Sequence, residues 1–102
     1  MELTVDGVAY PLRYSLRALK TFEQKTKTSV FALGEAHAMT AEAMCWLIYV
    51  GMVDGCKFEG IEFKKTLAEI EPYVDLGHVQ QAVEALQEYT GEGQKKATTK
   101  KP

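Results

Sequence analysis

Alternating apolar residues at the start of the chain predict a β-hairpin. Apolar side chains recur at every second position in residues 3–5 and again in residues 8–12, on either side of Asp6-Gly7. An Asp-Gly pair between two such runs favours a type I′ turn, in which both central residues have positive φ. Pro11 has no N–H to donate, so we expect it on an edge strand or with its nitrogen facing solvent. Because an isolated hairpin is marginal in water, its apolar face should pack on the residues that follow.

The pattern then changes to the three- and four-residue spacing of helices. Ser15 is predicted to cap a first helix that ends near Thr26. The apolar side chains of this helix are expected along one side, at Leu16, Leu19 and Phe22.

The most apolar stretch of the chain predicts a central helix. After a short helical turn expected at residues 29–33, Thr40 caps a segment from Ala41 to about Val53 that is apolar on all sides, and Asp54-Gly55 is expected to end it. A helix of this kind lies either in the middle of a core or partly buried by a partner protein. Residues 56–62 are expected to form a connector whose apolar side chains cover the core.

Two further helices complete the predicted fold. A short amphipathic helix carries Phe63, Leu67 and Ile70 and ends before Pro72. Asp75 is predicted to cap the last helix. Its apolar side chains repeat at spacings of three and four residues, at Leu76, Val79, Val83 and Leu86. The predicted fold is therefore mainly α (α+β), with an N-terminal β-hairpin followed by a compact bundle of four to five short helices.

Length and composition indicate a single domain with a tail. A chain of 102 residues, 46% of them apolar, corresponds to one core of ordinary size. We assign residues 1–90 to a single helical domain with the hairpin, and residues 91–102 to a flexible, disordered basic tail. The tail is predicted to be disordered because it has no large apolar side chain with which to offset the entropy of ordering.

The domain is acidic and the tail is basic. Residues 1–90 hold 8 basic and 13 acidic side chains, a net charge of −5, whereas the tail has a net charge of +3. An acidic domain repels the phosphate backbone, so sequence-independent binding of nucleic acid is not expected. The chain shows neither an apolar stretch of membrane-spanning length nor a signal-peptide pattern, which predicts a cytosolic protein that does not bind membranes.

The residue types that carry catalysis or bind metals occur without the neighbours that those functions need. Cys45 lies in the apolar helix, where thiols are mostly buried, and Cys56 is expected in a loop without a base or cation cluster to lower its pKa. His37 and His78 form no metal-ligand pair, so each is expected to be a surface or capping residue. A glycine-rich phosphate loop is absent from the sequence. We therefore expect no enzymatic activity, no cofactor and no metal.

Two features favour an interaction with another protein. The apolar helix holds more large side chains than a small domain easily hides, so its aromatic residues are either core residues or part of a binding surface. Together with the stripe on the last helix they give the candidate partner contacts Trp46, Tyr49, Val79, Val83 and Leu86. The tail, with Lys95 and Lys96, is a solvated end, a linker or an electrostatic handle for an acidic partner.

The order of these motifs resembles the tail assembly chaperones of long-tailed (siphovirus-type) bacteriophages and prophages. In residues 3–20, a strand, an Asp-Gly turn and a second strand lead through Arg13-Tyr14 into a helix that begins Leu16-Arg17-Ala18-Leu19. Residues 22–33 and the segment Leu47–Met52 are similar to two further stretches of that family. The resemblance covers residues 3–90, and this chain has Lys27 where glycine is common in the family.

The resemblance implies a non-enzymatic role in virion assembly. Such chaperones bind the long, aggregation-prone tape measure protein in the host cytoplasm, keep it soluble, help recruit tail tube protein and are absent from the mature virion. In many of them, programmed ribosomal frameshifting near the end of the gene adds a second domain. Lys95-Lys96 fits this arrangement, because two lysine codons supply an A-rich slippery run and the tail can act as a linker. We expect several copies, as a homo-oligomer or side by side, to coat a helical client.

The alternative is a small helical regulator or adaptor that binds nucleic acid through one helix. Its support is a group of five cations within fifteen residues, at Arg13, Arg17, Lys20, Lys25 and Lys27. In a helix-turn-helix, however, the second helix presents polar and basic side chains to the groove. Residues 30–33 are apolar instead, which ranks the adaptor below the chaperone.

Overall fold

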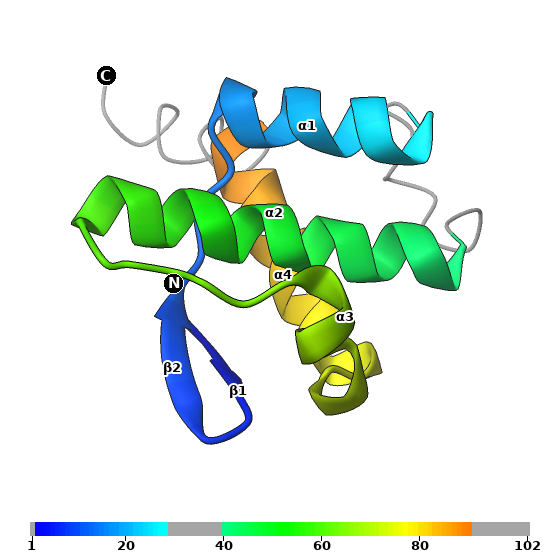
Figure 1. Ribbon diagram of the computed structural model, residues 1–102. Coiled ribbons are helices and arrows are strands. Elements are labelled where there is room, and N and C mark those ends of the chain that lie inside the picture. Colours follow the sequence, from blue (N-terminus) through cyan, green and yellow to red (C-terminus); the bar gives the residue numbers. More distant parts are fainter. Residues whose placement is uncertain (1, 29–39, 91–102) are drawn as a thin grey trace.

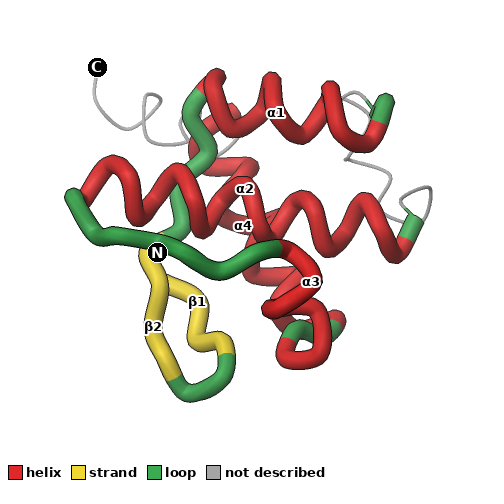
Figure 2. The backbone as a smooth tube through the Cα atoms, viewed as in Figure 1, coloured by secondary structure: helices red, strands yellow, loops and turns green. Residues whose placement is uncertain are grey.

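The computed structural model describes residues 2–28 and 40–90 and shows the predicted combination of a hairpin and a helical bundle (Figure 1; Figure 2). The elements, in chain order, are β1 (Glu2–Val5), β2 (Val8–Pro11), α1 (Leu16–Thr26), α2 (Ala41–Glu59), α3 (Leu67–Ile70), the 3-10 helix η3 (Glu71–Tyr73) and α4 (Leu76–Thr90). The helical turn predicted at residues 29–33, His37 and the tail with Lys95 and Lys96 lie outside the described residues.

The hairpin has the predicted turn and register. Its two strands are antiparallel, with Leu3 opposite Tyr10 and Val5 opposite Val8. Asp6 and Gly7 have φ of 52° and 76°, as a type I′ turn requires. Leu3 and Val5 are buried, so the hairpin packs its apolar face on the bundle.

Helix α2 is the central element of the fold. Figure 1 shows it crossing the middle of the molecule, with α1 and α4 against it, and α3 and β2 also touch it. Thr40 caps it as predicted, since its hydroxyl oxygen accepts a hydrogen bond from the N–H of Ala43 at 3.1 Å. Leu47, Ile48 and Met52 are fully buried. One side of this apolar helix therefore lies in the middle of the core, while Met44, Trp46 and Tyr49 on it are only partly buried.

The prediction that α2 ends at Asp54-Gly55 is wrong, because the helix continues to Glu59 and ends at Gly60, whose φ is 74°. Gly55 lies inside the helix for a tertiary reason. The chain leaving β2 crosses α2 so closely that a Cβ on Gly55 would overlap the carbonyl of Pro11. One turn earlier, Gly51 accepts a hydrogen bond from the N–H of Arg13 at 3.1 Å.

The longer α2 also changes the predicted connector. Cys56 to Glu59 are helical, and the two apolar side chains expected to cover the core, Phe58 and Ile61, are exposed instead. Phe58 is 66% exposed. The guanidinium carbon of Arg13 lies over its ring, 4.2 Å from the ring centroid.

Helix α1 has the predicted bounds but a different buried face. Ser15 occupies the N-cap position without a side-chain capping bond. Leu16 is 83% exposed, whereas Ala18, Leu19 and Phe22 face the core. Leu19 and Phe22 are therefore core residues as predicted, and Ala18 rather than Leu16 completes the buried side.

Helix α3 is shorter than predicted, and Phe63 lies before it. Thr66 and Glu69 form a capping box, with the Thr66 N–H donating to Glu69 at 2.7 Å. The helix ends before Pro72 as predicted, and Pro72 lies within η3.

Helix α4 begins with the predicted cap. Oδ1 of Asp75 accepts a hydrogen bond from the N–H of His78 at 3.1 Å, and Nδ1 of His78 accepts one from the N–H of Asp75 at 3.0 Å. Nε2 of His78 lies 2.7 Å from the carbonyl oxygen of Thr4 and joins the helix to the hairpin. The expectation that His78 is a capping residue is confirmed.

The buried face of α4 differs from the predicted stripe. Ala82, Ala85 and Leu86 are buried, while Leu76 is exposed. Leu86 is buried as predicted, and Val79 and Val83 pack against the core while only partly buried, so the side of α4 buried most deeply includes the small side chains of Ala82 and Ala85. Within residues 2–28 and 40–90, no helix has the length and apolar character needed to cross a membrane.

Candidate partner-binding site

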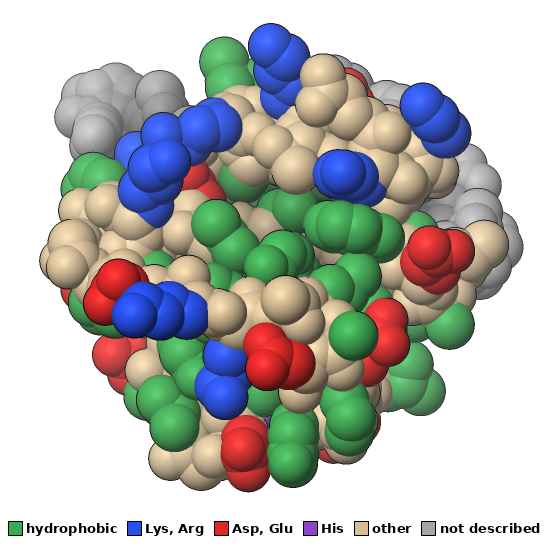
Figure 3. Space-filling view, viewed as in Figure 1, with side chains coloured by type: hydrophobic (Ala, Val, Ile, Leu, Met, Phe, Trp, Pro, Cys, Tyr) green, Lys and Arg blue, Asp and Glu red, His purple; other side chains and the backbone are tan. Residues whose placement is uncertain are grey.

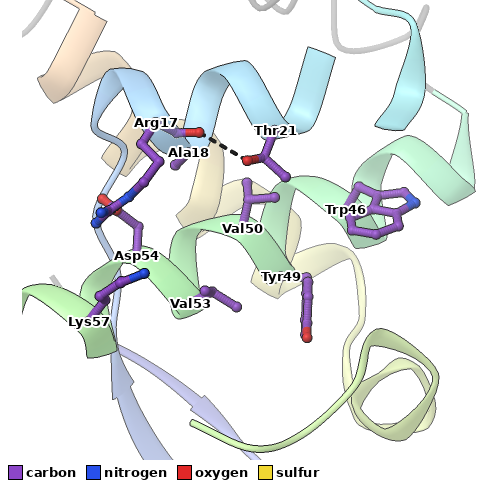
Figure 4. Close-up of a pocket in the computed structure, with 9 residues that line it drawn as sticks. All are labelled: Arg17, Ala18, Thr21, Trp46, Tyr49, Val50, Val53, Asp54 and Lys57. Atoms are coloured by element: carbon purple, nitrogen blue, oxygen red, sulfur yellow. Dashed lines mark hydrogen bonds and ion pairs between the residues drawn. The ribbon is translucent and has the colours of Figure 1, made fainter. Parts of the chain in front are cut away.

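An open pocket of about 220 Å³ lies between α1 and α2 (Figure 4). Its apolar lining comes from both helices, with Ala18 from α1 and Trp46, Tyr49, Val50 and Val53 from α2. The four α2 residues recur at spacings of three and four, so they share the face of the helix that borders α1. We call this feature the Trp46 pocket.

Charged side chains border the Trp46 pocket at both ends. Arg17 and Lys57 lie at one end, beside Asp54 (Figure 4). At the other end, the ammonium of Lys25 lies 5.7 Å from the centroid of the Trp46 ring. Arg17, near the start of α1, lies beside Asp54 near the end of α2, and Lys25, near the end of α1, lies beside Trp46 near the start of α2. The two helices are therefore antiparallel.

An aromatic cluster holds the floor of the Trp46 pocket in place. The rings of Trp46 and Tyr49 pack edge to face, with centroids 5.8 Å apart and planes at 82°. Tyr49 also contacts Phe63 at 5.8 Å, and Phe63 packs on Tyr10 of β2 at 5.4 Å. Stacking of this kind fixes the orientation of rings that are only half-buried.

The hydroxyl of Tyr49 is neutral and anchored. It donates a hydrogen bond to the carbonyl oxygen of Lys65 at 2.8 Å. Burial, and then the nearby carboxylate of Glu69, raise the pKa of Tyr49 above its usual value. Tyr49 therefore presents a ring and no charge to the pocket at neutral pH.

Asp54 is a buried carboxylate that organises the charged end of the pocket. One oxygen accepts hydrogen bonds from Nη2 and Nε of Arg17, at 2.8 and 3.3 Å. The other accepts from Nη1 of Arg13 at 3.3 Å and from the N–H of Ser15 at 3.2 Å. Burial alone would raise the pKa of Asp54, but the hydrogen bonds from Arg17 and Ser15 outweigh it and hold the pKa below its usual value.

Sequence reasoning missed the role of Asp54. An Asp-Gly pair after an apolar helix resembles a helix end, and it was interpreted as one. The signal that was available is the single carboxylate inside a long apolar run, together with two arginines four residues apart, Arg13 and Arg17. A charge in such a run needs an ionic partner, because its burial is otherwise costly.

The structure brings two of the five candidate contacts together. Trp46 and Tyr49 line the same pocket. Val79 and Val83 lie on α4, half-buried against the core and outside this pocket. Leu86 is 3% exposed and belongs to the core, so the expectation that it contacts a partner is corrected.

The two cysteines have different surroundings from those expected. Cys56 lies in α2 and is fully buried rather than in a loop, and Cys45 is half-buried. Burial raises the pKa of both thiols, with further contributions from Glu71 and Glu42 at Cys45 and from Glu59 at Cys56. Both thiols are therefore held in the protonated form, which is the poorer nucleophile.

The five cations of α1 and its flanks are not equally available. Arg13 and Arg17 pair with Asp54, whereas Lys20, Lys25 and Lys27 are exposed. Figure 3 shows Lys and Arg side chains along α1, above a group of hydrophobic side chains in the middle of the same face. This face combines apolar surface with positive charge in a domain that is acidic as a whole.

Comparisons with protein-family models, with curated proteins and with solved structures found no match to this chain.

Proposed function

We propose that this protein is a non-enzymatic phage tail assembly chaperone that binds the tape measure protein, keeps it soluble and helps recruit tail tube protein. It acts in the host cytoplasm and is absent from the mature virion. The observation that carries the proposal is the Trp46 pocket, where half-buried aromatic side chains are open to solvent in an otherwise well-packed small domain. Aromatic anchors in an apolar pocket are typical of protein-binding surfaces.

The motif order in residues 3–20 supports the same proposal, since the hairpin, its Asp-Gly turn and the helix that follows are those of the family that the sequence resembles. A shallow apolar pocket binds one segment weakly. A long client offers many segments, so several copies of the chaperone hold it through their combined contacts. The client stays soluble because its apolar stripes are covered before they meet one another.

Co-expression with the tape measure protein encoded by the same genome tests this function. We expect most of the client to be soluble when the chain is present and insoluble when it is absent. Trp46→Ala and Val53→Ser, which change the pocket, should reduce the soluble fraction severalfold. Phe58→Ala is the matched control, because it removes an exposed aromatic ring of the same helix outside the pocket.

Thermal unfolding of each variant separates a loss of binding from a loss of fold. If the wild-type chain leaves the client as insoluble as its absence does, the chaperone function is wrong. If folded Trp46→Ala protects the client fully, the binding surface lies elsewhere. Tight binding of duplex DNA that weakens steeply with salt would favour the regulator or adaptor instead.

A further inference from the structure

We propose that the Trp46 pocket selects a helical segment of another protein that carries one bulky apolar side chain between carboxylates. This inference rests on the proposed function, because it names the class of client segment that the chaperone binds. Three observations carry it: the charges around the pocket, the shape of the pocket and the surfaces that this chain itself can offer.

The charges favour an acidic ligand. Arg17, Lys25 and Lys57 border the Trp46 pocket, and the one carboxylate that lines it, Asp54, is buried and paired with arginines. Two further carboxylates, Glu42 one turn before Trp46 and Glu69 near Tyr49, lie close by but do not line the pocket. Residues 1–90 have a net charge of −5, so this local excess of positive charge is opposite to the sign of the domain. Local charge of this kind attracts carboxylates and repels cationic segments.

Arg17 is already oriented for a second carboxylate. Two of its nitrogens donate to Asp54, and its side chain is nevertheless 58% exposed. Because these bonds fix the guanidinium plane, a ligand carboxylate meets a side chain that loses little further freedom on binding. Lys57, one turn after Val53 on α2, adds a mobile ammonium to the same end.

The shape favours a helix about three turns long. Trp46 and Lys57, at the two ends of the pocket, are eleven positions apart on α2, which is about 16 Å at a rise of 1.5 Å per residue. A third helix packs naturally into the groove between two antiparallel helices. The cavity of about 220 Å³ exceeds the roughly 150 Å³ that suffices to hold a benzene ring, so it accepts one large apolar side chain.

Two segments of the chain, the tail and α4 of a second copy, are poor occupants. The tail at residues 91–102 has a net charge of +3 and would be repelled by the lysines and arginine at the pocket. The exposed apolar side chain of α4 in a second copy is Leu76, the first residue of the helix. The solvent-facing carboxylates of that helix, Glu84 and Glu88, lie two turns or more further on, so they do not stand on either side of it. We therefore assign the occupant to another protein.

Fluorescence of Trp46 measures occupancy directly, because it is the only tryptophan of the chain. The full chain is titrated with two synthetic helical peptides that share a central Leu and differ only in having Glu or Lys at both ends. We expect the Glu peptide to shift the emission of Trp46 to shorter wavelength. We expect the affinity of the Lys peptide to be lower than that of the Glu peptide by a factor of up to about ten. Two or three partly exposed ion pairs together give about that factor. The affinity of the Glu peptide should fall as salt is added.

Two lysine variants supply a matched pair. Lys57→Glu reverses a charge at the pocket, and Lys64→Glu makes the same change at an exposed lysine that pairs with Glu62 outside the pocket. Lys57→Glu should lower the affinity for the Glu peptide and raise the affinity for the Lys peptide. Lys64→Glu should leave both affinities close to those of the wild-type chain.

The outcomes separate this inference from the function beneath it. Equal binding of the two peptides, or equal effects of the two lysine variants, would overturn the selection of acidic segments. Failure of both peptides to bind, with the tape measure protein still kept soluble, would refute the inference and leave the chaperone function standing. If the emission of Trp46 shifts as the concentration of the chain is raised without any peptide, a second copy of the chain occupies the pocket. That result would also overturn the inference.

Discussion

At the scale of single residues, Asp54 joins α2 to a segment that is distant in sequence, residues 13–17. Its carboxylate accepts hydrogen bonds from Arg13, after the hairpin, and from Ser15 and Arg17, at the start of α1. Asp54 itself lies on the buried side of α2. Its side chain is 3% exposed, whereas those of Arg13 and Arg17 are partly exposed. Both ion pairs therefore lie at the edge of the core. Removing one partner from such a group leaves buried charge or hydrogen-bonding capacity without compensation.

Asp54→Asn should lower the free energy of unfolding at neutral pH by about 2–3 kcal/mol, since charge-assisted hydrogen bonds to a buried group become neutral ones. The difference from the wild-type protein should also depend on pH. The folded pKa of Asp54 lies below its unfolded value of about 3.9, so its contribution is complete above that value and is lost as pH falls through the folded pKa. Urea unfolding of both proteins between neutral and acidic pH measures this. A difference that stays constant down to the lowest pH would contradict the role given to Asp54.

Gly55→Ala tests the close crossing of the chain over α2. In an exposed helix this change is usually stabilising, by about 1 kcal/mol. Here the new methyl group would overlap the backbone of Pro11, which cannot rotate away, so we expect a loss of about 3 kcal/mol in the free energy of unfolding. Calorimetric or urea unfolding gives the sign directly. A gain in stability would mean that the hairpin does not lie against α2 as described.

Residue-level predictions from the sequence succeeded where the chemistry is local. The positive φ of Asp6-Gly7 and the caps at Thr40 and Asp75 depend on a few neighbouring residues, and all three are confirmed. The position of Asp54 and the need for Gly55 depend on a chain segment some forty residues away, as the separation of 41 between Arg13 and Asp54 shows. A local pattern could not distinguish that pair from a helix end.

At the scale of elements, α1 ends without the glycine that usually follows a helix. Lys27 terminates the helix with φ of 59°, a left-handed conformation in which its Cβ is crowded, and its N–H bonds to the carbonyl of Glu23. Glycine adopts this conformation without that steric cost.

Lys27→Gly should therefore raise the free energy of unfolding by about 1 kcal/mol, by removing the steric cost of the left-handed conformation. Lys27→Ala is the control, because it removes the same charge and long side chain but keeps the Cβ. We expect the alanine variant to be no more stable than the wild-type protein. Equal stabilisation by both substitutions would assign the effect to charge rather than to backbone conformation.

Helix faces were harder to predict than helix bounds. Regular spacing placed Leu16 and Leu76 with the core residues, yet both are exposed. The buried side of α4 is centred on Ala82 and Ala85, which a search for large apolar residues passes over. Which side of an amphipathic helix packs closely depends on the shape of its neighbour, and α2 became a neighbour of both helices only through the fold.

At the scale of the whole molecule, the Trp46 pocket arises from the packing of α1 against α2. Trp46 and Tyr49 were predicted as contacts because the apolar helix holds more large side chains than a small domain easily hides, and they share a pocket. The cations at its two ends could not be assigned from sequence, because they meet only when the helices are antiparallel. Val79 and Val83 lie on another helix, so the candidate contacts do not form one surface.

Hydrogen exchange of the chain with and without the tape measure protein is the measurement that tests client binding at the Trp46 pocket most directly. We expect added client to slow the exchange of amides in residues 17–25 and 46–57, which flank the pocket on both helices. Amides in residues 78–86 of α4 should exchange at an unchanged rate. Protection confined to α4, or no protection at saturating client, would contradict the proposal that clients bind between α1 and α2.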